Sequence, residues 1–352
     1  MYRADEPERA GVLSQRQMKR MIASGGISYV KSYCSDFSPT MMSLLLTGNG
    51  TENKESFVLE RGEERDFDLN VATGTVRRGL HFIADGKTTT ARIGLSVDVI
   101  DADGCKLPYQ PSSDYPADVS PHPKAGVLRA RIKATQFPVI LWPGNPVANL
   151  RVFYGEPEES LMDPLSRGEF LYVDGKTVPL SELQTRKGRY LEMHLNLKSP
   201  VHNGATGYVS LDNSTGKIRH EKGANNPSKF YASITADETW TANPDTLSLL
   251  YTLEELDLTG GGVREPCIGF MRRRINGSDA INFATMLEPE LPKRLAIEIQ
   301  PRGREMKLHH GQYICDVDLY RGCETLDIKT HNSGNRHPFG KLFKSYGNCA
   351  TA

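Results

Sequence analysis

The segment LRARIKATQFPVILWPGNPVANLRVFYG at residues 128–155 decides the predicted fold, because the chain repeats its pattern as LAIEIQPRGREMKLHHGQYICDVDLYRG at residues 295–322. The two copies align from end to end at a constant offset, without a gap. The identical residues include Leu128 and Leu295, Ile132 and Ile299, Leu141 and Leu308, Gly144 and Gly311, and Gly155 and Gly322. Each copy reads as strand, short turn, strand, glycine turn and strand. A gap-free repeat of this length predicts a duplicated β domain.

The rest of the chain fits two β domains with few short helices. Pro, Ser and charged residues cluster at 156–168, which predicts a joint between a first domain at residues 1–160 and a second at residues 161–352. Short alternating apolar runs, bounded by glycine turns, precede both copies. One helix is predicted after Ser14, because Gln17 three residues later completes a capping box and two glycines end the apolar stripe.

The composition excludes several classes of protein. Lysine plus arginine and aspartate plus glutamate both number 43, so the formal net charge is zero, whereas a generic nucleic-acid or membrane-surface binder is usually basic. The first residues form no apolar signal segment, and no apolar run approaches the length of a membrane span. The six cysteines form no CxxC pair and are typical of reduced thiols. We therefore expect a cytoplasmic protein that binds neither nucleic acid nor membrane.

A second stretch, Gly86-Lys87-Thr88-Thr89-Thr90-Ala91-Arg92, carries the first candidate residues for chemistry. It places two cations and three hydroxyls directly before the alternating run Ile93–Ile100. Cations, hydroxyls and backbone N–H groups in such a loop can bind a phosphate chain. A P-loop is excluded, because His81 stands where that motif needs its first glycine and three threonines disfavour the helix that must follow. The alternative is a polar surface turn.

Several segments follow one another in the order of the motifs of a known family. Lys87–Arg92 falls at an Arg/Lys-Ser-Ser-x-x-Arg signature, and Leu295–Ile299 matches a Leu-Glu-Val strand that holds a catalytic glutamate. The other matches are Gly11–Ile22 and Ser38–Leu46 to an opening helix and strand, Phe137–Val139 to Phe-Pro-Val, Gly144–Arg151 to Gly-Asp-x-x-x-Gln-Leu-Arg, Phe283–Pro289 to aromatic-Ala-Gly-Phe-Phe-Asp-Pro, and Gly311–Ile314 to Gly-Gln-x-Ile. Taken in this order, the matching segments cover most of the chain. The chain therefore resembles the dCTP deaminases, including their long tandem form in bacteria.

This resemblance implies a mainly β fold of two tandem dUTPase-like distorted β-barrels, and a homotrimer or other homo-oligomer with sites at subunit interfaces. It implies a deoxynucleoside triphosphate substrate, dCTP or dUTP, that carries Mg²⁺, and deamination of dCTP to dUTP without zinc. Catalysis would rest on Glu298 as general base and acid, with Thr88 holding the water and Arg92 orienting the glutamate. The implied substrate-binding residues are Lys87, Thr89, Thr90, Asn149 and Gln312, and no metal ligands are implied.

The chain departs from the family pattern in both copies. Arg131 stands at the glutamate position of the first copy, so the glutamate is present only as Glu298 in the second. Ser43 replaces the aspartate of the opening strand, and the second copy lacks a Lys-Thr-Thr-Thr-x-Arg loop. Either one site is assembled from both copies or catalysis has been lost. Zinc chemistry is not predicted, because no histidine precedes a glutamate by two positions and Pro266-Cys267 has no second cysteine.

Two other functions stay open. A dUTP diphosphatase on the same fold would use an aspartate on a β-hairpin, for which Asp101 in the segment Val99–Gly104 is the candidate. A nucleotide-binding or regulatory protein could keep the fold and lose turnover, which the missing glutamate of the first copy favours. Glu298 could also be an ordinary polar-face residue of an alternating strand. The base specificity, and whether hydrolysis follows deamination, also stay open.

Overall fold

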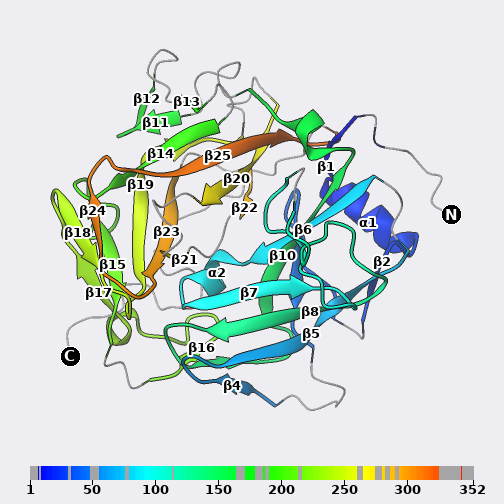
Figure 1. Ribbon diagram of the computed structural model, residues 1–352, viewed down its shortest axis with the longest axis horizontal. Coiled ribbons are helices and arrows are strands. Elements are labelled where there is room, and N and C mark those ends of the chain that lie inside the picture. Colours follow the sequence, from blue (N-terminus) through cyan, green and yellow to red (C-terminus); the bar gives the residue numbers. More distant parts are fainter. Residues whose placement is uncertain are drawn as a thin grey trace.

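The computed structural model of the chain has a mainly β fold (Figure 1), as the sequence predicts. The structure describes residues 7, 9–30, 33–47, 55–75, 79–112, 115–163, 171–178, 185–186, 190–212, 216–259, 265–273, 280–281, 286–289, 293–324 and 342. In Figure 1 most strands of the first half lie at the bottom and right, and most strands of the second half at the top and left. Within this described part of the chain, no helix is long and apolar enough to cross a membrane.

The described residues of the first half form two four-stranded antiparallel sheets and part of a smaller sheet. Its elements are β1 (Gly11–Val12), α1 (Gln15–Ala23), β2 (Ile27–Tyr29), β3 (Met42–Leu45), β4 (Phe57–Leu59), β5 (Glu64–Thr73), β6 (Leu80–Gly86), α2 (Thr88–Ala91), β7 (Leu95–Ile100), β8 (Gly126–Ala134), β9 (Val139–Leu141), β10 (Pro146–Tyr154) and the 3₁₀ helix η1 (Pro157–Ser160). One four-stranded sheet has the order β2-β5-β8-β7, and in the other β10 pairs with β1, β3 and β6. Strands β4 and β9 pair in the smaller sheet. Helix α1 begins after Ser14, which forms the predicted capping box with Gln17.

The second half is built around β19, β23 and β25. Its elements are β11 (Leu171–Val173), β12 (Lys176–Thr177), β13 (Thr185–Arg186), β14 (Tyr190–Asn196), β15 (Gly207–Ser210), β16 (Ile218–Arg219), the 3₁₀ helix η4 (Pro227–Lys229), β17 (Tyr231–Ile234), β18 (Thr239–Ala242), β19 (Ser248–Leu256), β20 (Cys267–Arg273), β21 (Ala280–Ile281), β22 (Met286–Leu287), β23 (Lys293–Pro301), β24 (Met306–His309) and β25 (Tyr313–Arg321). Strand β19 pairs with β14, β15 and β23, while β25 pairs with β14 and β20.

The repeated sequence copies fold into strands with corresponding bounds. Strands β8 and β23 begin and end at matching positions of the two copies, as do β10 and β25, and β24 begins at the position that matches the start of β9. The pairings correspond as well, because both β5–β8 and β19–β23 contain an irregularity at the same place: between Asp68 and Ala72 in the first half, and between Tyr251 and Glu255 in the second. The strand–turn–strand pattern predicted for each copy is therefore present in the structure.

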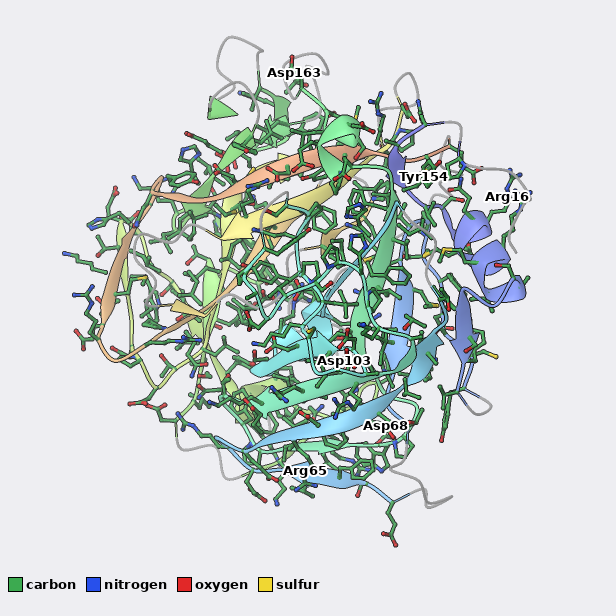
Figure 2. All side chains as sticks on the ribbon, turned by 45° about the vertical axis from the view of Figure 1, so that its right-hand side comes forward. Arg16, Arg65, Asp68, Asp103, Tyr154 and Asp163 are labelled. Atoms are coloured by element: carbon green, nitrogen blue, oxygen red, sulfur yellow. The ribbon has the colours of Figure 1, made fainter. Side chains whose placement is uncertain are left out.

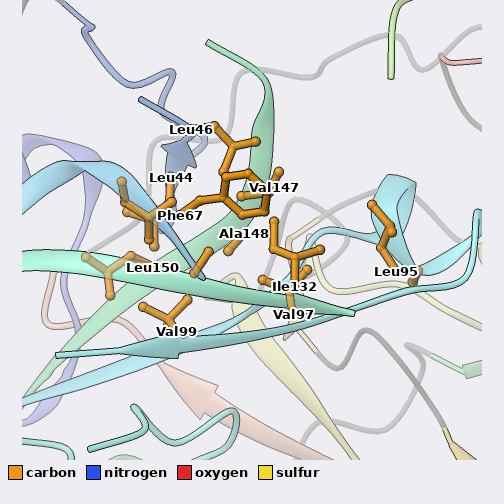
Figure 3. Packing of buried hydrophobic residues seen from close by; sticks show 14 of the residues in the cluster. Leu44, Leu46, Phe67, Leu95, Val97, Val99, Ile132, Val147, Ala148 and Leu150 are labelled. Atoms are coloured by element: carbon orange, nitrogen blue, oxygen red, sulfur yellow. The ribbon is translucent and has the colours of Figure 1, made fainter. Parts of the chain in front are cut away.

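Alternating apolar residues of the first half form one core, to which both four-stranded sheets contribute (Figure 3). Leu95, Val97 and Val99 of β7 are buried in it with Ile132 of β8 and Phe67 of β5. Burying each large apolar side chain contributes about 1.5–3 kcal/mol to the stability of the fold. The period-2 pattern that predicted a half-buried strand after Arg92 is confirmed by β7.

The core of the first half continues into residues of the second half, and side chains fill the space between the ribbons (Figure 2). Tyr208 and Ile218 are buried in the same apolar cluster as the first-half strands. Phe137 meets Phe230 and Tyr231 edge-on, at 5.5 Å between ring centroids in each case. The predicted domain boundary near residue 160 stays a prediction, and the apolar packing extends across it.

The threonine run does form a short helix, which differs from the sequence expectation. Helix α2 is a single turn from Thr88 to Ala91 with Lys87 at its N-cap. The hydroxyl of Thr90 donates to the carbonyl of Lys87 at 2.6 Å, and this local bond stabilises the turn that β-branching disfavours. Because the turn leads directly to β7 and His81 stands at the position of the first glycine, the exclusion of a P-loop is unaffected.

Candidate functional site

One face of the second-half sheet carries a carboxylate and three phenols. The strand order is β17-β15-β19-β23, and residues paired across neighbouring strands lie on the same face. Glu298 is paired with Leu249, and Tyr251 follows Leu249 by two residues, so Glu298 and Tyr251 share a face. Tyr208 is also paired with Leu249, and Tyr231 is paired with the residue two positions after Tyr208. The sheet register therefore brings Glu298, Tyr251 and Tyr231 to one side.

The first half presents Arg92 to this face. Arg92 caps the C-terminus of α2, and its Nε lies 3.8 Å from Oε1 of Glu298. The Glu298 side chain is fully buried, and that of Arg92 is 18% exposed. Figure 1 shows α2 at the centre of the molecule, between strands of the two halves. Two residues predicted as catalytic, which lie far apart in the sequence, thus meet within one chain.

Two buried tyrosines surround the Arg92–Glu298 pair. The Tyr231 hydroxyl donates a hydrogen bond to the backbone carbonyl of Arg92, which ties the end of α2 to the second half. Burial, and then the negative charge of Glu298, raise the pKa of Tyr231 well above its usual value. Burial likewise raises the pKa of Tyr251 to about 12, with Glu298 adding to the shift and Arg92 opposing it. Both phenols therefore keep their protons at neutral pH and can donate hydrogen bonds.

Several buried polar atoms at this place have no hydrogen-bond partner among the described residues. They are Nε of Arg92, the hydroxyl of Tyr251 and Oε1 of Gln300. Gln300 follows Glu298 by two residues on β23, and its Nε2 donates to Oε1 of Gln136 in the first half at 3.3 Å. A buried polar group that stays without a partner costs about 1–3 kcal/mol. A cluster of such atoms from both halves is typical of a place that receives a polar ligand or ordered water.

Lys87 lies at the other end of α2, in a separate polar cluster. Its Nζ donates to Oγ of Ser43 at 2.9 Å and to Oδ1 of Asn149 at 3.0 Å. Ser43 and Asn149 are paired across β3 and β10, and the Lys87 N–H bonds the carbonyl of Val147 on β10. The structure therefore brings together two predicted substrate-binding residues, Lys87 and Asn149, with the serine that replaces the family's aspartate.

The three threonines of the loop have different surroundings. Thr90 is fully buried, and its hydroxyl donates to the carbonyls of Lys87 and Val147, so its observed contacts stabilise the turn and reach no open site. Thr88 and Thr89 lie half-buried at the start of α2. Within the described residues, neither of these two hydroxyls makes a hydrogen bond, so both are available to a ligand.

Gln312 lies apart from the other predicted residues. It sits in the turn between β24 and β25, where its Oε1 accepts the N–H of His309 at 2.9 Å. Asn145, at the matching position of the first copy, makes the corresponding bond to the N–H of Trp142 at 2.8 Å. Figure 1 places the β24 hairpin at the edge of the molecule and α2 at its centre. The glycine–glutamine motif is explained by turn geometry, and the structure does not bring Gln312 to the Arg92–Glu298 pair.

Arg131 and Asp101 have structural partners. Arg131 forms a two-point ion pair with Asp66 on the neighbouring strand, at 2.9 and 3.2 Å. Asp101 is buried and accepts the backbone N–H groups of Asp103, Cys105 and Lys124 at 2.9–3.0 Å. Three backbone bonds fix the Asp101 carboxylate in a turn, and this geometry gives no support to a water-activating role. Among the described residues, no group of three or more His, Cys, Asp or Glu side chains could hold a metal ion.

The sequence analysis missed Tyr231, Tyr251 and Gln300. For two of these positions, period-2 spacing indicates the face of the strand. Gln300 lies two residues after Glu298 on β23, and Tyr251 lies two residues after Leu249 on the neighbouring β19. Tyr231 had none, since its contact with Arg92 depends on how β17 docks on the first half.

Comparison with known proteins gives a likeness of fold. No protein-family model matches the sequence. A search of curated proteins finds no match either. Among solved structures, the 2′-deoxycytidine 5′-triphosphate deaminase from Agrobacterium tumefaciens is similar, with a TM-score of 0.70 and 16% sequence identity. The similarity covers 90% of this chain and 100% of that one, so the two proteins share their fold over nearly the whole length.

Proposed function

We propose that this chain deaminates dCTP to dUTP at a site formed by Arg92 of the first half and Glu298 of the second. The observation that carries the proposal is the fully buried Glu298 carboxylate 3.8 Å from Arg92, beside buried polar atoms that have no hydrogen-bond partner among the described residues. The shared fold with an enzyme named for this reaction supports it. The matching strand bounds of the two sequence copies support the further proposal that the halves are tandem copies of one domain.

The proposed reaction adds water to C4 of cytosine and expels ammonia. A carboxylate must take a proton from the water and return one to the leaving nitrogen. Glu298 performs both steps, and the adjacent positive charge of Arg92 favours its ionised form. The Tyr251 phenol keeps its proton, because its pKa is raised to about 12, and it can donate a hydrogen bond to the tetrahedral intermediate. The Thr88 hydroxyl positions the attacking water.

The triphosphate end of the substrate is assigned to Lys87. Ser43 and Asn149 hold its ammonium group in place, and its charge suits a triphosphate that arrives with Mg²⁺. Zinc has no part in this proposal. Because Arg92 and Glu298 meet within one chain, the pair needs no second subunit. A homo-oligomer is proposed from the family resemblance alone, and a cytoplasmic location from the composition of the chain.

The test is incubation of protein treated with EDTA, then dialysed, with dCTP and magnesium chloride. We expect equal amounts of dUTP and ammonia without added zinc. Glu305→Gln, which removes an exposed carboxylate from the same half, is the matched control and should retain the wild-type rate. Activity that chelation abolishes, and that zinc but not magnesium restores, would contradict the mechanism. Formation of dUMP and pyrophosphate from dUTP would support the diphosphatase, and binding without turnover would support the regulatory homologue.

A further inference from the structure

An amide side chain lies beside the proposed catalytic carboxylate on the same strand. Gln300 follows Glu298 by two positions on β23, so the two side chains share one face of the sheet. Two residues of a strand span about 6.6 Å, which is close to the width of a pyrimidine base. Tyr251 is paired with Ala296, which precedes Glu298 by the same two positions. The carboxylate therefore has an amide on one side along the strand and a phenol on the other.

The first half of the chain holds the Gln300 amide. Its Nε2 donates to the carbonyl of Thr135 at 3.5 Å and to Oε1 of Gln136 at 3.3 Å. The backbone N–H and the hydroxyl of Thr135 both donate to the carbonyl of Gly94, at 2.7 and 2.8 Å. Gly94 follows Arg92 by two residues, so the segment that holds Gln300 is tied to the segment that carries Arg92.

The close approach of these two segments requires glycine at position 94. Gly94 has a φ of +69°, and a Cβ at this position would lie 2.5 Å from Cβ of Gln136. Any other residue would push Gln136 away from the Arg92 segment and would strain the backbone. The two halves together therefore build the surroundings of Gln300.

The contact with Thr135 decides which end of the Gln300 amide faces the first half. A backbone carbonyl can only accept hydrogen bonds, so the NH₂ group points to Thr135 and the Oε1 oxygen takes the other position. This oxygen is buried without a hydrogen-bond partner among the described residues, and Gln300 as a whole is 7% exposed. A buried acceptor that stays unpaired costs free energy, and a ligand that brings an N–H or O–H group removes that cost.

We propose that Oε1 of Gln300 accepts a hydrogen bond from the 4-amino group of cytosine and so selects cytosine over uracil nucleotides. The inference rests on the proposed function, because it takes C4 of the base to lie beside Glu298. Uracil has a carbonyl oxygen at C4, and this acceptor would face the Gln300 acceptor without a proton between them. In the tetrahedral intermediate the amine at C4 lies toward Gln300, and the new oxygen lies toward the Tyr251 phenol. The same acceptor disfavours the product, dUTP, and so promotes its release.

The test compares the binding of dCTP and dUTP, both with magnesium, by titration calorimetry. All proteins carry Glu298→Gln, so that dCTP is not consumed and its binding is measured whether or not the wild type deaminates it. We expect this parent to bind dCTP about tenfold more tightly than dUTP, the size of one buried hydrogen bond. Gln300→Met keeps the length of the side chain without the acceptor and should bring the ratio of the two affinities close to one. Gln15→Met, at the first residue of α1, is the matched control and should keep the ratio of the parent.

The outcomes separate the two proposals. Equal affinities of the parent for dCTP and dUTP, or an unchanged ratio in Gln300→Met, overturn the role of Gln300 and leave the deaminase proposal standing. If Gln300→Met does not fold, Gln300→Asn replaces it, because its shorter side chain withdraws the oxygen from the base and must lower the same ratio. A protein that binds neither nucleotide overturns both proposals. A ratio lost in Gln300→Met, when the wild type does not deaminate dCTP, supports the recognition of the base and overturns only the reaction.

Discussion

Replacing Glu298 with glutamine is the most direct perturbation of the proposed mechanism. Glutamine keeps the size of the side chain but can neither carry charge nor accept the proton of the water. At 3.8 Å, the attraction between Arg92 and Glu298 is about 4 kcal/mol at an effective dielectric constant of about 20. Loss of a general base lowers turnover by about 10²–10⁴-fold. Such a loss corresponds to about 2.7–5.4 kcal/mol of activation free energy, the same size as the attraction that holds the carboxylate in place.

The assay measures kcat for dCTP, with nucleotide affinity by calorimetry and thermal stability as companions. The affinity of Glu298→Gln for dCTP should stay within a few-fold of wild type, because the phosphate contacts lie at Lys87. The activation free energy should rise by more than the free energy of unfolding falls. Burying the Glu298 charge costs free energy in the folded protein, and this cost offsets the attraction to Arg92. Glu298→Gln protein that turns over dCTP at the wild-type rate would refute the reasoning, and so would an equal loss in the Glu305→Gln control.

Three further predictions concern Arg92, Lys87 and His194. Mixing Arg92→Ala protein with Glu298→Gln protein should restore no activity, because both residues act within one chain; restored activity would show a site between subunits. Lys87→Ala should weaken triphosphate binding by about 1.5–3 kcal/mol, and more at low salt, and unchanged affinity by calorimetry would make the loop a surface turn. The pKa of His194 is raised mainly by its 2.7 Å bond to Glu254. The thermal midpoint of wild type should therefore exceed that of His194→Gln below about pH 6.5, and the excess should disappear as pH rises through the raised pKa. A difference in thermal midpoint that does not change with pH would contradict the coupling.

The features that the sequence predicts well have a periodic or local cause. The presence of β8 and β23 follows from period-2 alternation in a repeated segment, and the start of α1 follows from the capping box at Ser14. The meeting of Arg92 with Glu298 was predictable for another reason. The family resemblance offered two alternatives, a site assembled from both copies or a loss of catalysis, and the first of them predicts that Arg92 and Glu298 lie close together.

The features that the sequence does not predict depend on docking between the halves. Tyr231 reaches the first half from β17, and the two-residue strand β16 pairs with β9 of the first half. Neither β17 nor β16 is long enough to show a period. The surroundings of Gln312 were also not predictable, because the sequence does not show that its side chain accepts the N–H of His309 within the turn. Thr90 is a similar case, because its hydroxyl donates to the carbonyl of Lys87 within the turn.

The two corresponding sheet positions have different cross-strand partners. In the first half the position holds Arg131, and the opposite residue is Asp66, so the charge is neutralised within its own sheet. In the second half the position holds Glu298, and the opposite residue is Leu249, whose side chain has no polar atom. A buried carboxylate is stabilised by a nearby positive charge. Arg92 of the other half lies 3.8 Å from this carboxylate, and the candidate site therefore lies where the second-half sheet places a buried carboxylate opposite leucine.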